Sequence, residues 1–154
     1  MSIGLLEAYP GDDYLQSPVD DLWSFYYVAQ WAAAYNGFQQ GGDILRGLRR
    51  FRDDIRGSLK DREFATLNVI DSKIKRASEY GTFLSECGSL LKKWRGKLVE
   101  LELGWVKAFD NLKRAQVEGH LYAMYYPHFR KLTDKGVLDL LELIAEHFFD
   151  GNTR

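Results

Sequence analysis

The sequence predicts an all-α protein: a helical bundle around an apolar central helix at about residues 19–36. Apolar residues recur every three or four positions through most of the chain, proline occurs only three times, and no alternating strand pattern longer than a few residues is present. The 154 residues are enough to bury one core. We therefore expect a single helical domain over residues 1–154.

Residues 1–17 are expected to form a loop-rich lead-in, because a Pro-Gly-Asp-Asp cluster there favours a turn. The central helix then begins at Ser17, whose hydroxyl is expected to cap the first N–H groups, with Pro18 in the first helical position. Asp20 and Asp21 place negative charge at the positive end of the helix dipole.

From Leu22 to Tyr35 the central helix carries apolar side chains on every face, with Trp23, Tyr27 and Trp31 on one side. A helix that is apolar all round is buried inside a protein. The run is also shorter than the roughly 20 apolar residues that cross a membrane. We therefore expect a buried core helix that ends at Asn36-Gly37.

Two shorter helices are expected next. Asp43 is placed to cap a helix from Ile44 to about Arg56, and a third helix covers about Asp61 to Ala77. The side chains expected to face the core are Leu45, Leu48, Phe51 and Ile55 in the first of these helices and Phe64, Leu67, Ile70 and Ile74 in the second.

The longest periodic signal predicts a helix from about Ser85 to Lys113. Its apolar seam, spaced alternately by three and four residues, comprises Leu84, Cys87, Leu91, Trp94, Leu98, Leu101, Trp105, Ala108 and Leu112. A coiled coil would have this spacing, but two tryptophans are bulky for a two-stranded coil, so we favour a long helix in a globular bundle. Cys87 is then a packing residue rather than a nucleophile. Gly88, Gly96 and Gly104 weaken the helix and mark kinks or close contacts.

The C-terminal part predicts two further helices. The first covers Gln116 to Tyr126 and ends near Pro127. The second is capped by Thr133 or Asp134 and continues to about Phe149. Its broad apolar face comprises Val137, Leu138, Leu141, Ile144, Ala145 and Phe148.

The sequence lacks the glycine-rich, P-loop, HExxH, GxSxG and EF-hand motifs. His120, His128 and His147 lie far apart, so we interpret them as surface or half-buried residues. A turn accounts for Asp12-Asp13 and helix capping for Asp20-Asp21. We therefore expect no enzyme activity, no metal and no cofactor.

The net charge of −1 argues against a general nucleic-acid binder. The single cysteine excludes an intrachain disulfide. No signal peptide and no apolar run of membrane-spanning length is visible, so we expect an intracellular, cytoplasmic protein without a membrane anchor.

A candidate basic patch comprises Arg46, Arg49, Arg50 and Arg56. Such a patch could bind phosphates or an acidic partner. Nearby aspartates dilute the positive charge, however, and a solvated helix face is the favoured interpretation.

One segment resembles a known family. Asp21-Leu22-Trp23-Ser24-Phe25-Tyr26 matches the D-x-W-S-x-x pattern that opens the central helix of the protein-kinase C-lobe. The longer run Asp20–Trp31 resembles the D-L-E-S-F-x-Y-V-L-x-W run of the fungal-type protein kinases. Met1–Glu7 resembles the M-S-x-E-L-L segment that closes the activation segment of the same family.

The resemblance implies the fold of the lower, helical half of a kinase C-lobe, with the 19–36 helix as its buried hub. Kinase chemistry needs a glycine-rich loop, a strand lysine, a catalytic aspartate and a magnesium-binding aspartate, and these precede the segment that Met1 matches. This sequence departs from the family's pattern at two positions. Gly4 stands where the family has the glutamate of M-S-x-E-L-L, which forms an ion pair, and Trp23 stands where the family has the glutamate of D-L-E-S-F. Asp21 matches the aspartate that holds the catalytic loop, so without that loop it keeps a capping role or finds a new partner.

Two functional hypotheses follow. The first is a non-catalytic remnant of a fungal-type kinase C-lobe that acts as a protein-binding module or self-associates through exposed aromatics of the hub helix. Its structural or partner-binding residues would be Asp21, Trp23, Ser24, Tyr27 and Trp31. The alternative is a kinase-unrelated interaction domain that uses the basic 44–56 helix or the 84–112 helix.

Overall fold

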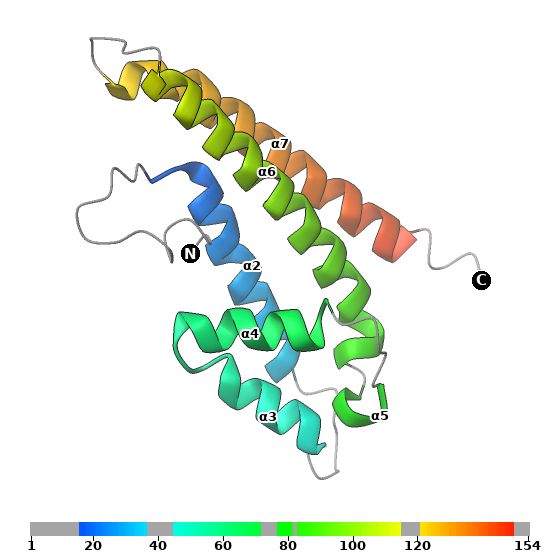
Figure 1. Ribbon diagram of the computed structural model, residues 1–154. Helices are drawn as coiled ribbons and strands as arrows, with labels where there is room; N and C mark the ends of the chain where they lie inside the picture. Colours follow the sequence, from blue (N-terminus) through cyan, green and yellow to red (C-terminus); the bar gives the residue numbers. More distant parts are fainter. Residues whose placement is uncertain (1–15, 37–44, 72–76, 82, 115–120, 150–154) are drawn as a thin grey trace. The chain divides into compact units, whose positions relative to one another are not determined.

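The computed structural model describes residues 16–36, 45–71, 77–81, 83–114 and 121–149. About 90% of these residues are helical and none of them lies in a strand, so the all-α prediction is confirmed. The helices are α2 (Pro18–Tyr35), α3 (Arg46–Asp54), α4 (Leu59–Val69), α5 (Ala77–Tyr80), the π-helical turn η1 (Phe83–Cys87), α6 (Gly88–Arg114) and α7 (Leu121–Phe149) (Figure 1). None of these helices is long and apolar enough to cross a membrane.

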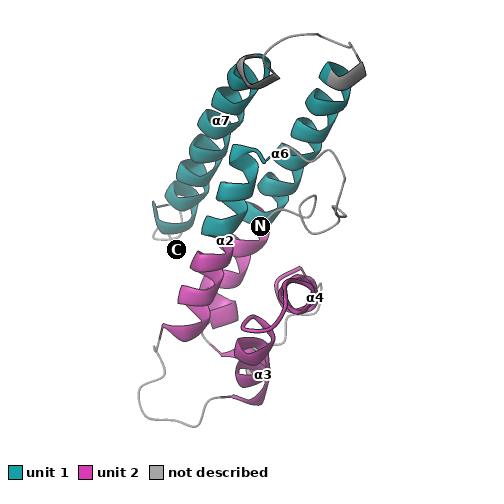
Figure 2. Ribbon diagram, turned by 90° about the vertical axis from the view of Figure 1, so that its left-hand side faces the viewer, with its two compact units in different colours: residues 1–25, 94–154 teal, residues 26–93 magenta. Residues whose placement is uncertain are grey.

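The chain forms two compact units (Figure 2). The first unit comprises residues 1–25 and 94–154, and therefore the first turns of α2, most of α6, and α7. The second unit comprises residues 26–93, which include α3, α4 and α5. A single domain over the whole chain stays a prediction.

Helix α2 begins at Pro18, as predicted, but a different side chain caps it. The backbone N–H of Ser17 donates to the Asp20 carboxylate at 2.8 Å. The Ser17 hydroxyl is buried and has no hydrogen-bond partner among the described residues, so the prediction that it caps the helix is wrong. Asp20, the third residue of the helix, instead accepts the hydrogen bond from the N-cap backbone that forms one half of a capping box. Asp21 is exposed.

The prediction that α2 is buried on every face is wrong. Phe25, Val28 and Trp31 are 63%, 64% and 49% exposed. The buried side chains of α2 are Val19, Asp20, Leu22, Trp23, Tyr26, Tyr27, Gln30 and Ala34. Neighbouring helices therefore cover only part of the circumference, because a helix at the edge of a bundle needs just one covered stripe.

In the first unit α6 and α7 lie side by side and run in opposite directions (Figure 1). Trp94, Leu98, Leu101 and Trp105 of the predicted seam are buried. The Trp105 ring lies 5.6 Å from the Tyr125 ring and 5.1 Å from the Phe129 ring of α7. The seam is thus the inner face of a long helix in a bundle.

Helix α7 is one continuous helix where the sequence predicts two, the first ending near Pro127 and the second starting at Thr133 or Asp134. Pro127 lies inside the helix, although it removes one backbone hydrogen bond. Tyr125 and Phe129, on either side of Pro127, are buried, and their packing offsets that loss. The Thr133 hydroxyl donates to the Phe129 carbonyl at 2.9 Å and caps no helix start. Residues 116–120 of the predicted 116–126 helix lie outside the described residues.

In the second unit α3 begins two residues later than predicted. Its N-cap residue, Leu45, makes no side-chain cap hydrogen bond, and Asp43 lies outside the described residues. Leu48, Phe51 and Ile55 are buried, as predicted.

The face of α4 that points inward differs from the predicted one. Its inward side chains are Ala65, Thr66 and Val69, with Ile70 just after it. Phe64 and Leu67 are exposed, so their predicted burial is wrong, and Ile74 lies outside the described residues. A capping box between Ser58 and Asp61 sets the start of the helix at Leu59, and on the inward face the Thr66 hydroxyl accepts a hydrogen bond from the Gln30 amide of α2.

The three glycines of the long helix differ. A Cβ on Gly88 would lie 2.9 Å from Leu84, whereas one on Gly96 or Gly104 would meet nothing within 4 Å. The close-contact interpretation therefore holds for Gly88 alone. The π-helical turn at Phe83–Cys87 precedes Gly88, so the α-helix begins three residues later than predicted.

Candidate functional site

A groove of about 690 Å³ opens in the second unit, between α3, α4 and α5. Its apolar lining comes from Phe51 of α3 and from Ala65 and Val69 of α4, all buried. The Phe51 ring stacks on Phe83 with the ring centroids 5.2 Å apart, which holds it in place. Phe64 also lines the groove but is 66% exposed. The groove thus has an apolar interior and an aromatic residue open to solvent.

Charged groups lie along both sides of this groove. Arg46 and Arg50, one turn apart, line it from α3, and Glu79 and Tyr80 line it from α5. The Arg50 Nε atom is 3.9 Å from the Asp54 carboxylate, and the Arg50 side chain is 83% exposed. Such an exposed pair contributes little to stability and leaves the guanidinium able to exchange partners.

Gly47 sets the distance between α3 and α5. A Cβ at this position would lie 2.6 Å from the Glu79 carbonyl oxygen and 3.0 Å from Glu79 Cβ. Backbone atoms cannot move aside as a flexible side chain can. Gly47 therefore permits the close approach that shapes one end of the groove, and the sequence alone did not single it out.

The predicted basic patch divides into two groups. Arg46 and Arg50 line the groove, and Arg49 is exposed. Arg56 lies over the Tyr35 ring, 5.5 Å from its centroid. Arg52 lies 4.9 Å from the same centroid and donates to the Ala34 carbonyl at 2.7 Å. The second group packs α3 against the end of α2, so only the first is placed for ligand binding.

The hub-helix candidates in the first unit have structural partners. The Trp23 indole N–H donates to the Glu102 carboxylate at 3.0 Å, and both side chains are buried. The Ser24 hydroxyl donates to the Asp20 carbonyl at 3.0 Å. Asp21 is exposed. Trp23 and Ser24 are therefore held by the fold.

In the second unit the remaining hub-helix candidates differ in exposure. The Tyr27 hydroxyl donates to Glu63 at 2.8 Å, and Tyr27 is buried. Trp31 is half-exposed and stacks on Tyr35 at 4.9 Å. Sequence reasoning missed Gln30, whose amide donates to the Thr66 hydroxyl at 2.8 Å in the interior. A glutamine amid a long apolar run is the signal that could have found it.

The described part of the chain holds no group of three His, Cys, Asp or Glu side chains that could bind a metal ion. Asp12, Asp13 and His120 lie outside that part. Burial raises the pKa of the Cys87 thiol, and the negative charge of Glu86 raises it further. A protonated, half-buried thiol is a poor nucleophile, in accord with a packing role.

Comparison with known protein families, with curated proteins and with solved structures finds no match. The chemistry of the site therefore rests on the groove itself. Sequence reasoning found its arginines but not Phe64 as an exposed residue. The sequence holds no local signal for the exposure of Phe64, because the periodicity of α4 does not say which of its faces is covered.

Proposed function

We propose that this chain is a non-catalytic helical domain that binds a segment of another protein in the groove between α3, α4 and α5. The observation that carries the proposal is the combination of a buried apolar lining, the exposed Phe64 and two arginines one turn apart. A large side chain left in water forgoes roughly 1.5–3 kcal/mol of burial. A bound apolar side chain would recover part of that free energy at Phe64.

The groove suits a peptide with one apolar anchor flanked by carboxylates. Ala65 and Val69 are small enough to leave room beside Phe51 for an incoming side chain. Arg46 and Arg50 present planar guanidinium groups, which bind carboxylates through paired hydrogen bonds. Because Asp54 and Glu79 also line the groove, carboxylates of the peptide would be repelled beside them, so the acidic residues of the ligand must lie beside Arg46 and Arg50.

The binding proposal is tested with peptides. Phage-displayed random peptides are selected on the whole chain, and affinities of the winners are measured by fluorescence anisotropy. We expect an apolar residue with acidic neighbours, and a loss of affinity of about tenfold or more, the usual size of a binding hot spot, for Phe64→Ser and for Arg46→Glu/Arg50→Glu.

Leu103→Ser is the matched control, because Leu103 on α6 is 65% exposed and Phe64 is 66% exposed. It should leave peptide affinity unchanged. Peptides whose affinity is indifferent to Phe64 and to both arginines would contradict the proposal.

We also propose that the chain is a remnant resembling the C-lobe of a fungal-type protein kinase. The support for this origin is the sequence resemblance of Asp20–Trp31 and Met1–Glu7. On this proposal the chain binds no nucleotide, so ATP with magnesium should leave its melting temperature unchanged. A clear ATP-dependent rise in the melting temperature would contradict it.

An intracellular location is likewise a proposal, supported by the single cysteine.

A second candidate surface lies on α2 within the second unit. Val28 and Trp31 are exposed and lie one turn apart, so this face could bind a partner or a second copy. Trp31→Ser in the peptide assay distinguishes this α2 surface from the groove.

The alternative of a kinase-unrelated interaction domain keeps the basic 44–56 helix or the 84–112 helix as its binding element. Arg49→Glu/Arg50→Glu should abolish binding if the basic helix is used.

A further inference from the structure

Helix α7 has two apolar faces. The first packs within its own unit through Tyr125, Phe129 and Leu143, which are buried. The second lies on the outside of the C-terminal half and comprises Val137, Leu138, Leu141, Ala145 and Phe148, all exposed. We call these five residues the outer stripe. Leu138 and Leu141 are 59% and 57% exposed.

The outer stripe is continuous along the helix. Its members follow one another at spacings of one, three, four and three residues, which keeps them on one side. The stretch from Val137 to Phe148 covers about 17 Å at 1.5 Å per residue. Scattered single apolar residues are normal on a protein surface, but a continuous stripe marks an interaction site. Asp134 bounds it on the N-terminal side.

Four exposed charges flank the outer stripe on one side. Lys131 and Lys135 precede its centre, and Glu142 and Glu146 follow it. Their spacing of four, seven and four residues corresponds closely to whole turns, so all four project from the same flank. This flank is therefore positive at one end and negative at the other.

We propose that the N-terminal half of the outer stripe, with Val137, Leu138 and Leu141, is the interface of a homodimer in which two copies of α7 pack in antiparallel orientation. Lys131 and Glu146 are equally far from the midpoint between residues 138 and 139, and so are Lys135 and Glu142. One antiparallel register therefore brings both lysines of each copy opposite both glutamates of the other. Two-fold symmetry forms each pair twice. Parallel two-fold packing would place this flank of the two copies on opposite sides of the seam, where these four charges could not pair with one another.

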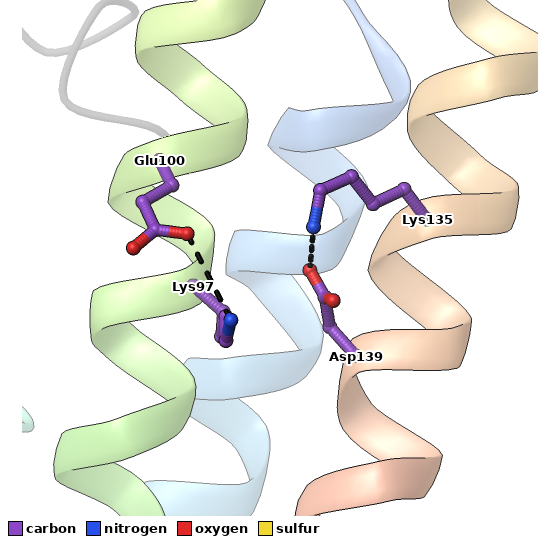
Figure 3. Close-up of polar contacts among 4 residues, drawn as sticks. All are labelled: Lys97, Glu100, Lys135 and Asp139. Carbon is purple, nitrogen blue, oxygen red and sulfur yellow. Dashed lines mark hydrogen bonds and ion pairs between the residues drawn. The ribbon is translucent and has the colours of Figure 1, made fainter.

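The two ion pairs are not equivalent. Lys135 donates to Asp139 of its own helix at 2.7 Å (Figure 3), and Asp139 is buried. Lys135 must therefore share its charge between Asp139 and the second copy.

The apolar contacts of this register centre on Leu138. The Leu138 side chains of the two copies lie beside the two-fold axis, and Leu141 lies opposite Val137 of the second copy. The interface is short and at the small end of the range for protein dimers. We therefore expect a dissociation constant on the order of micromolar to tens of micromolar.

The register is tested by charge reversal in the full chain. Lys131→Glu and Glu146→Lys are each studied by sedimentation velocity from about 1 to 300 µM, a range chosen around the expected dissociation constant. Each variant alone should dimerise about tenfold more weakly, because each reversal turns two attractive pairs into two repulsive pairs. An equimolar mixture should form a heterodimer with wild-type affinity, since every lysine then faces a glutamate.

Leu138→Glu should leave the chain monomeric over the whole concentration range. Leu103→Glu is the control, because Leu103 is similarly exposed on α6, and it should dimerise as the wild type does. Circular dichroism establishes that each variant keeps its helix content. A wild-type chain that stays monomeric at 300 µM overturns the proposal. So does a dimer that is unaffected by Leu138→Glu, or a mixture of the two charge variants that dimerises no better than either alone.

Discussion

Replacing Gly136 by alanine should destabilise the first unit, although alanine forms helices better than glycine. Gly136 is buried inside α7. A Cβ there would collide with Leu22 Cδ1 of α2 and would lie 3.2 Å from Leu101 Cδ1 of α6. Gly136 therefore lies where α7 approaches side chains of both α2 and α6 closely.

The magnitude follows from two opposing terms. Alanine gains up to about 1 kcal/mol of helix propensity over glycine. Overpacking a filled interior costs about 1–3 kcal/mol, and both leucines are buried here. The net change for Gly136→Ala is therefore a loss of roughly 0–2 kcal/mol.

Gly104→Ala is the matched substitution, because it lies in the interior of α6 and a Cβ there meets nothing within 4 Å. It should stabilise the chain by up to about 1 kcal/mol. The propensity gain is shared by both variants, so the difference between them measures the close contact alone. That difference should be about 1–3 kcal/mol.

Urea unfolding followed by circular dichroism and tryptophan fluorescence measures both free energies. The expected order of stability is Gly104→Ala, wild type, Gly136→Ala. In a Leu22→Ala background the penalty at residue 136 should fall to a small remainder, because the colliding methyl group is gone and only the 3.2 Å contact with Leu101 remains. Equal stability of Gly136→Ala and Gly104→Ala would show that the close contact is absent and that the reasoning is wrong.

Three other measurements check individual contacts. Ser58→Ala should lower the free energy of unfolding in urea at pH 7, because α4 loses its N-cap hydroxyl. The side-chain and backbone hydrogen bonds of Ser58 lower the pKa of Asp61, and the substitution removes the first of them. The loss should therefore be present above the usual carboxyl pKa and should fade as the pH falls through the lowered value. Burial raises the pKa of the Cys87 thiol, so iodoacetamide should alkylate the thiol more slowly in the folded than in the unfolded chain. Equal alkylation rates in the two states would contradict the burial of this thiol. The stability that the protonated thiol contributes should be lost as the pH rises through the raised pKa. Glu102→Leu removes the acceptor of the Trp23 indole and should cost about 1–3 kcal/mol in urea, whereas Glu102→Gln retains an acceptor oxygen and should cost less.

Local patterns predicted the elements whose packing follows their own periodicity. The alternating three and four spacing through Trp94, Leu98, Leu101 and Trp105 correctly predicted the buried face of α6. Pro18 correctly marked the start of α2, because proline suits a position that needs no N–H. In both cases the signal lies within a few residues of the feature.

Local patterns failed where a distant contact outweighs a local preference. Proline ends a helix by its own geometry, yet α7 continues through Pro127 because the flanking Tyr125 and Phe129 pack on Trp105. Phe64 follows an inward spacing in the sequence but is exposed, because α4 turns the face with Thr66 inward, where the Thr66 hydroxyl accepts a hydrogen bond from Gln30 of α2.

The sequence by itself determined that this protein is helical, where its long helix buries a seam, and which arginines stand on one short basic helix. Only the tertiary structure decided which apolar faces stay uncovered and which arginines share a groove with Phe64. The physical reason is that periodicity identifies an apolar face but not its neighbour. Helix α7 illustrates the difference: its sequence predicted one broad apolar face, yet the packing of its unit leaves Val137, Leu138, Leu141 and Phe148 of that face exposed.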